Sequence, residues 1–209
     1  DVGVRDIAAH IFEGLVTVNA GLEVQPMLAE SFEISEDGST ITFNLRQGIT
    51  FHNGEEMTAS DVIASLERWI SLSTQAKNYL SEMTFEEVDD YTVVATNPNS
   101  TVLDIHVLAD FTQFAAIMPK EIAEQAGQDE IDEYIGTGPY EFGEFRQNQY
   151  VHLTKYADYQ SREEPADALA GEKRAYMDDI YFHFVADAST RVAGLQSGEY
   201  DIATQIPHD

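Results

Sequence analysis

Cysteine is absent from this chain of 209 residues, and lysine and arginine are scarce. The lack of cysteine excludes disulfides, thiol nucleophiles and thiolate metal sites. Eleven basic residues stand against 38 acidic ones, a formal net charge of −27. Such a chain repels the phosphate backbone that nucleic-acid-binding proteins must neutralise, so we expect no nucleic-acid partner. Because the acidic residues are spread along the whole chain, we interpret them as a solvated surface suited to salty or alkaline surroundings.

Long apolar runs are also missing. No stretch approaches the ~18 apolar residues that a membrane-spanning helix needs. The chain is 43% hydrophobic and 11% aromatic, enough for a folded core, and its length suits one large domain or two small ones. It begins at Asp1 without methionine or a signal peptide, which we interpret as the mark of a processed or trimmed chain.

The sequence motifs of enzymes and metal sites are not found either. Neither Gly-x-Ser-x-Gly nor Ser-x-x-Lys occurs, which argues against nucleophilic catalysis. The six histidines are scattered, and adjacent carboxylates such as Glu55 and Glu56 do not face each other on a strand or a helix. Gly136 and Gly138 lack the third glycine of a dinucleotide-binding loop. We therefore expect no catalytic residue, no metal site and no cofactor.

Apolar residues at helical spacing predict four helices. Residues 4–15 form an amphipathic segment that ends near Gly14, and residues 58–70, capped by Thr58, place the only tryptophan on a buried face. Pro119 and Gly127 mark the ends of a helix over 119–126, with the proline at its first position. The fourth helix begins after Asp187 and stops at Gly198. Residues 103–118 are mixed in period and stay ambiguous.

Alternating polar and apolar residues predict the strands. We expect one hairpin between a strand around Phe32 and residues 40–46, and a second between residues 142–145 and 150–156. Single strands are predicted at 91–96, at 180–184 and at 200–206, and residues 157–178 are expected to be irregular. Because a helix separates the last two strands, the pattern predicts a parallel βαβ unit over 180–206.

Four sequence blocks occur in a fixed order. They are residues 28–54 (LAESFEISEDGSTITFNLRQGITFHNG), residues 58–62 with 66–68 (TASDV and LER), residues 136–140 (GTGPY), and residues 187–191 with 198–203 (DASTR and GEYDIA). This series resembles the signature of the family 5 extracellular solute-binding proteins, the peptide- and nickel-binding receptors of ABC importers. The resemblance covers nearly the whole chain.

The resemblance implies an α/β chain with a type II periplasmic-binding-protein fold, of which this sequence is a fragment of lobe I with mixed sheets and flanking helices. Members of the family are more than twice as long. By their layout, residues 1–33 and 176–209 belong to the core of lobe I, and residues 34–175 form an appended subdomain. The second lobe is absent from this chain.

The function implied by the resemblance is capture of oligopeptides or dipeptides and their delivery to the transmembrane subunits of an ABC permease. Such a receptor is a monomer without enzymatic activity, located in the periplasm or cell envelope outside the cytoplasmic membrane, with lipid anchoring left open. Two alternatives remain: a receptor for a nickel chelate or another small organic solute, and an enzyme or surface-adhesion protein on the same scaffold. Nickel-chelate members use an arginine in the segment that corresponds to 111–118, and this chain has none there.

Position within the family layout also suggests where a ligand would touch this chain. Arg5 is a candidate partner for a ligand carboxylate and Asp6 for a ligand amine, whereas Tyr79 offers stacking or a hydrogen bond. Phe114, in the segment 111–116, and Gln205, at the exit of the chain, are further candidates. These five residues lie outside the four blocks, so their role rests on position alone.

Overall fold

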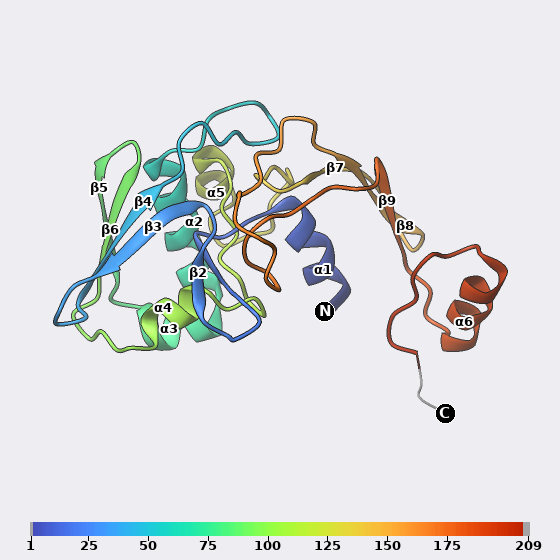
Figure 1. Cartoon of the computed structure of the whole chain (residues 1–209), viewed down its shortest axis with the longest axis horizontal. Coiled ribbons are helices and arrows are strands. Elements are labelled where there is room, and N and C mark those ends of the chain that lie inside the picture. Colours follow the sequence, from blue (N-terminus) through green and yellow to red (C-terminus); the bar gives the residue numbers. More distant parts are fainter. Residues whose placement is uncertain (1, 207–209) are drawn as a thin grey trace.

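Three antiparallel sheets organise residues 2–206, which are the residues described in the structure, a computed structural model (Figure 1). One sheet pairs β1 (Val16–Val18) with β2 (Val24–Pro26). The largest sheet has the order β3-β4-β6-β5, and the third has the order β7-β8-β9. Within residues 2–206, no helix combines the length and the apolar character needed to cross a membrane.

The four-stranded sheet contains the first predicted hairpin. β3 (Ala29–Ile34) and β4 (Thr40–Leu45) pair in the register that sets Phe32 opposite Phe43, which confirms the hairpin. At its turn, hydrogen bonds from Ser35 and Ser39 hold the pKa of Asp37 at about 2. β6 (Thr92–Thr96) confirms the single predicted strand, while β5 (Thr84–Asp89) was not predicted. The reason is that β5 is an acidic edge strand with almost no buried side chain, so its sequence carries no apolar alternation.

Helices α2 (Ala59–Leu72), α3 (Thr74–Leu80) and α4 (Asp104–Leu108) lie beside this sheet, and α5 (Lys120–Ala126) packs against α2. α2 confirms the helix expected after Thr58, and the buried Asp61 carboxylate accepts a hydrogen bond from the Thr58 backbone N–H at 2.8 Å. The other Asp61 oxygen accepts from the backbone N–H of Lys120, which joins the starts of α2 and α5. Pro119 is the N-cap of α5 rather than its first helical residue. α3 and α4 are short and were not predicted.

The first helix, α1 (Val2–Ile11), ends four residues before its predicted limit. The backbone after it bonds to distant segments instead of continuing the helix. The Ile11 carbonyl accepts from the Gly138 N–H at 2.9 Å, and the Glu13 carbonyl accepts from the Ile117 N–H at 2.9 Å. Tertiary partners thus end the helix, although the apolar spacing runs on to residue 15.

The third sheet contains the second predicted hairpin, β7 (Tyr140–Arg146) with β8 (Tyr150–Lys155), and β9 (Asp179–His183) pairs with β8. α6 (Ala188–Ser197) begins after Asp187, whose side chain accepts from the Thr190 N–H, and ends at Gly198 with φ +77°. The helix is therefore confirmed. The parallel βαβ unit is wrong, because residues 200–206 form no strand and have no strand of the described chain beside them.

Two buried apolar clusters form the core. The first lies between the four-stranded sheet and α2 and includes Phe43, Val62 and Leu66. The second lies between α1, α5 and the β7-β8-β9 sheet and includes Phe12 and Leu153. The α/β class with flanking helices is confirmed. The division into residues 1–33 with 176–209 and residues 34–175 stays a prediction.

Candidate functional site

The loop between α4 and α5 connects several of the predicted ligand-contact positions. The Gln113 carbonyl accepts a hydrogen bond from the Trp69 ring N–H at 2.6 Å, and the Gln113 side-chain oxygen accepts from the Ser73 hydroxyl at 2.8 Å. Ser73 is also the N-cap of α3. The neighbouring Phe114 is half-buried and packs against the second apolar cluster. The loop is therefore fixed to α2 and to the start of α3.

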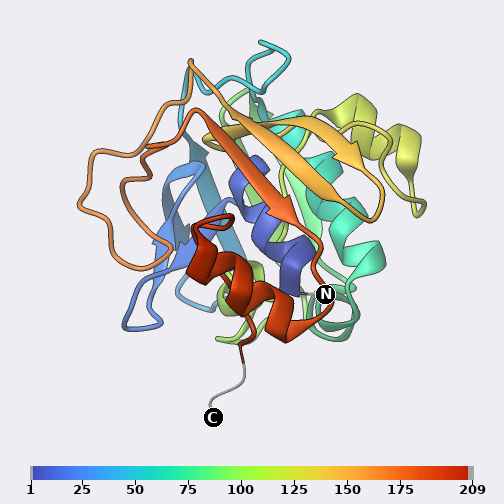
Figure 2. The same ribbon diagram turned by 90° about the vertical axis from the view of Figure 1, so that its right-hand side faces the viewer.

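Three further predicted contacts lie on α1 and α3. Arg5 is half-buried and Asp6 is exposed near the start of α1. Tyr79, on α3, is 45% exposed, and its backbone carbonyl accepts from the Asn97 amide, which also binds the buried Asp104 carboxylate. In Figures 1 and 2 the start of α1 and the helices α3 and α4 lie toward the lower side of the molecule.

We refer to this lower side, formed by the start of α1, by α3 and by residues 110–114, as the candidate face. Three large apolar side chains are exposed on its elements, Val4, Tyr79 and Phe111. Charged groups on the same elements include the Arg5 guanidinium, the Asp6 carboxylate and the exposed Lys77 ammonium. Apolar surface with a few placed polar groups is typical of binding sites for small organic solutes.

Gln205 is not brought to the candidate face by any described contact. Its φ is +55°, and its carbonyl accepts from the Arg191 guanidinium at 2.8 Å. The same guanidinium binds the carbonyls of Val185 and Ala186, so Arg191 joins the segments before and after α6. Figure 1 shows α6 and this segment apart from the rest of the molecule.

A buried carboxylate lies in the segment directly after α1. Glu13 follows α1, is 2% exposed, and accepts hydrogen bonds from Tyr159 at 2.9 Å, from Thr137 at 3.0 Å and from the Lys173 ammonium at 3.2 Å. Burial and the nearby Glu13 charge raise the pKa of Tyr159, which keeps its phenol a neutral donor. These bonds join four segments that are distant in sequence.

His52 fixes the chain reversal at residues 136–138. Its Nε2 bonds to the Gly138 carbonyl at 2.9 Å, and its Nδ1 accepts from the Gly136 N–H at 3.3 Å, which places the proton on Nε2. Burial lowers the pKa of His52, so the ring is neutral. A Cβ atom at either glycine would collide with the backbone at the end of α1, so only glycine fits at these two positions.

The sequence did not single out Glu13, His52 or Gln113. Gln113 carried the clearest signal, since it is a polar residue within a mostly apolar segment. Glu13 and His52 carried none, because their partners lie more than 80 residues away. Within residues 2–206, no group of three or more His, Asp or Glu side chains is arranged to hold a metal ion.

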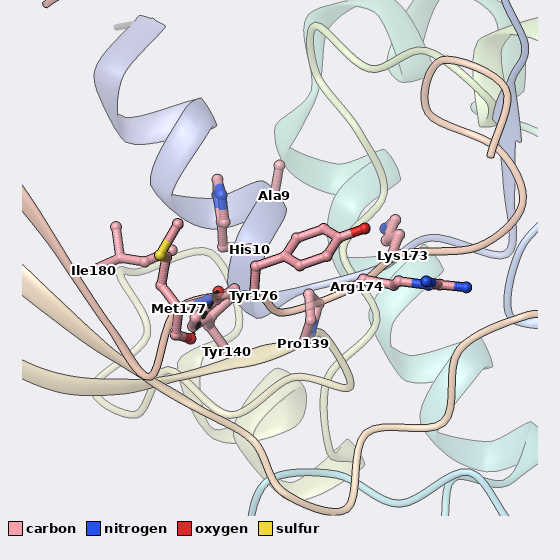
Figure 3. Close-up of a pocket in the computed structure, with 9 residues that line it drawn as sticks. All are labelled: Ala9, His10, Pro139, Tyr140, Lys173, Arg174, Tyr176, Met177 and Ile180. Carbon is pink, nitrogen blue, oxygen red and sulfur yellow. Dashed lines mark hydrogen bonds between the residues drawn. The ribbon is translucent and has the colours of Figure 1, made fainter. Parts of the chain in front are cut away.

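A cavity of about 370 Å³ lies apart from the candidate face, between α1 and residues 173–180 (Figure 3). α1 contributes Ala9 and His10 to it. The opposite wall is formed by residues that include Tyr176, Met177 and Ile180. None of the five predicted ligand contacts lines this cavity.

Known proteins of one family are similar to this chain in sequence and in fold. The sequence model of the bacterial extracellular solute-binding proteins, family 5 (middle), matches residues 23–209. The glutathione-binding protein GsiB of Escherichia coli K12 is 33% identical over 207 residues, which are 97% of this chain and 38% of GsiB. The chain thus spans well under half the length of this relative.

Two solved structures are similar over nearly the whole chain. The periplasmic binding protein AgaA of A. tumefaciens R10, in complex with agropinic acid, matches with a TM-score of 0.80 and 30% identity over 95% of this chain and 38% of AgaA. The binding protein DppA of Helicobacter pylori, in complex with the peptide STSA, matches with a TM-score of 0.73 and 28% identity over 91% of this chain and 40% of DppA. Sequence and fold agree, and the chain belongs to the family 5 extracellular solute-binding proteins.

Proposed function

We propose that this chain is part of a receptor that captures oligopeptides or dipeptides outside the cytoplasmic membrane and delivers them to an ABC permease. The observation that carries the proposal is the candidate face, where exposed apolar side chains lie on and around a loop that is hydrogen-bonded to α2 and to the start of α3. The relatives named above are binding proteins, with glutathione, agropinic acid or the peptide STSA as ligands.

The charges at the candidate face suit a zwitterionic peptide. Arg5 can pair with a terminal carboxylate and Asp6 with a terminal amine, while Tyr79 and Phe114 offer aromatic surface to side chains. Gln205 would join them only if the segment after α6 moves or is held by the rest of the receptor. The segment 111–118 has no arginine, which favours a peptide over a nickel chelate.

The mechanism we infer is closure of two lobes on the solute, with residues 1–33 and 176–209 in the core of the first lobe and residues 34–175 in its appended subdomain. Because this chain supplies one side of such a site, it would bury only part of a ligand. We expect the 209-residue chain alone to bind peptide weakly, and micromolar binding by it would contradict the two-lobed mechanism.

Native mass spectrometry of the full-length receptor, gently purified from its own host, tests the solute class. We expect a series of co-purified peptide masses, whose range gives the preferred length. A single sharp mass of a metal chelate or other small molecule would keep the family and refute the peptide assignment. Turnover of the bound solute would instead indicate an enzyme on this scaffold.

Titration calorimetry on the full-length receptor tests the candidate face. Tyr79→Ala should weaken peptide binding about tenfold, since one aromatic contact contributes roughly 1–1.5 kcal/mol. Phe145→Ala is the matched control, because Phe145 is 58% exposed but lies on β7, outside the candidate face. Equal affinities for the two variants would place the ligand elsewhere.

A further inference from the structure

The loop between β6 and α4 contains a motif that has no part in the site described above. Residues 99–101 are Asn-Ser-Thr, and Asn99 is the only asparagine of the sequence followed by one residue other than proline and then by serine or threonine. In proteins located outside the cytoplasm, this pattern is the acceptor of N-linked glycans. The glycan is bulky and hydrophilic, so an acceptor asparagine must lie at the surface.

The fold places Asn99 at the surface in a tight turn. The Ser100 N–H donates to the Asn97 carbonyl at 3.1 Å, which makes Asn99 the third residue of this turn. The side chain of Asn99 is exposed, and its amide donates to the exposed Glu82 carboxylate at 2.8 Å, a bond that water can replace. Residues 97–103 lie outside every helix and strand, next to the turn between β3 and β4 (Figure 1). An enzyme can therefore reach Asn99 without opening a sheet.

The two asparagines of this turn have different surroundings. Asn97 is 2% exposed, and its amide donates to the Asp104 carboxylate at 2.6 Å and to the Tyr79 carbonyl at 3.2 Å. The exposed Thr101 donates its hydroxyl to the other Asp104 oxygen at 3.0 Å. Asn97 thus fixes the loop to the core, whereas the amide of Asn99 lies at the surface.

Two exposed apolar side chains follow the motif directly. Val102 is 87% exposed and Leu103 is 46% exposed. Residues 97–103 contain no charged side chain, although the whole chain has a net charge of −27. Exposed loops are preferred sites of proteolytic cleavage. A glycan beside these two residues would cover apolar surface that the charges of the chain leave uncovered.

We propose that Asn99 is an N-glycosylation site and that its glycan shields Val102 and Leu103 in the receptor outside the cytoplasmic membrane. The donor is an oligosaccharide joined through phosphate to a polyprenyl lipid, and a membrane-bound transferase of the host catalyses the transfer. The Nδ2 atom of Asn99 forms a bond to the anomeric carbon of the sugar, and the bond from this carbon to the phosphate oxygen breaks. The lipid phosphate leaves with the electron pair, Nδ2 gives one proton to a base of the transferase, and nothing is oxidised or reduced.

Mass spectrometry of the full-length receptor, purified from its own host, tests the modification. Trypsin releases residues 78–120 as one peptide, because no lysine or arginine lies between Lys77 and Lys120. We expect this peptide to carry added sugar mass, with fragments that place the sugar on Asn99. An unmodified mass would overturn the proposal. Sugar placed on Ser100 or Thr101 would be O-linked and would overturn it as well.

Variants of the full-length receptor test whether the motif directs the modification. Thr101→Ser keeps the hydroxyl and should keep the added mass. Thr101→Val has a similar shape but no hydroxyl, so it should lose the added mass although Asn99 is unchanged. Asn53→Gln alters an exposed asparagine outside the motif and should keep the added mass. Added mass that persists in Thr101→Val would contradict the proposal.

Limited proteolysis of the same receptor tests the shielding. Asn99→Gln should be cleaved beside Val102 and Leu103 several-fold faster than the parent receptor, and Asn53→Gln should be cleaved at the parent rate. Equal rates for all three would refute the shielding. The proposal rests on the location of the family outside the cytoplasm and not on the solute. A receptor that binds no peptide would alter none of these results, so this proposal and the proposed function can fail separately.

Discussion

The buried carboxylate of Glu13 offers a direct test of how this structure is held together. Glu13→Gln keeps the shape of the side chain but removes its charge. Three donors, Tyr159, Thr137 and Lys173, now converge on the two oxygens of Glu13. Glutamine has one oxygen and an amide group that is itself a donor, so at least one of the three donors must lose its acceptor.

The expected loss of stability is about 2–3 kcal/mol. Hydrogen bonds to a charged group contribute about 1.5–3 kcal/mol each and neutral ones about 1 kcal/mol, so three weakened bonds lose roughly 3 kcal/mol in total. The Lys173 side chain is 28% exposed and can regain water, which reduces the loss. The Tyr159 phenol is desolvated by burial and regains water less readily, so most of the cost remains.

Urea unfolding of the 209-residue chain, followed by tryptophan fluorescence, measures this loss as a lower midpoint at unchanged slope. Glu36→Gln is the matched control, because it removes the same charge from an exposed position. It should change the free energy of unfolding by less than about 0.5 kcal/mol. If Glu13→Gln also stays within that range, the convergence of donors on Glu13 does not stabilise the fold.

Three further predictions concern the chain reversal and the surface charge. Gly138→Ala should lower the free energy of unfolding by about 3 kcal/mol in the same assay, because the added Cβ would collide with the His10 carbonyl. Gly48→Ala is the control: its Cβ meets no atom, so it should lower the free energy of unfolding by only about 1 kcal/mol, the strain of the positive φ. The chain should lose stability as the pH falls below 6.5, because the fold lowers the pKa of His52 and the unfolded chain therefore takes up the proton more readily. Between pH 7.5 and pH 5 the melting temperature should fall less for His52→Asn than for the parent chain. An equal fall in both would contradict this prediction. Raising the salt concentration from 0.1 to 1 M should raise the melting temperature, because the Debye length falls from about 10 to 3 Å and the repulsion within a chain of net charge −27 is screened. A lower melting temperature would mean that attractive ion pairs dominate.

Local sequence signals predicted the elements whose stability is local. α2 and α6 have capping residues at their starts, and the hairpin of β3 and β4 has a turn stabilised by the Asp37 side chain. Each of these signals depends on residues a few positions apart, so the sequence displays them directly. β5 and α3 were missed because the first is exposed and acidic and the second is only seven residues long.

The sequence-based predictions failed where contacts with a distant segment determine the local structure. The apolar spacing of α1 continues to Leu15. The N–H groups of Gly138 and Ile117, however, donate to the carbonyls of Ile11 and Glu13, and the helix ends at Ile11. The candidate face shows the same limit. The sequence indicated the segment 111–116, whereas the bonds of Gln113 to Trp69 and Ser73 that fix this segment required the structure.

The wrong βαβ prediction and the open edge of β9 have one physical explanation. A strand is stable only when its backbone groups find partners, so residues 200–206 can have the composition of a strand and still remain without regular structure. Tyr181 and His183 present unpaired groups, and Ile202 presents an exposed apolar side chain, close to the same place in the fold.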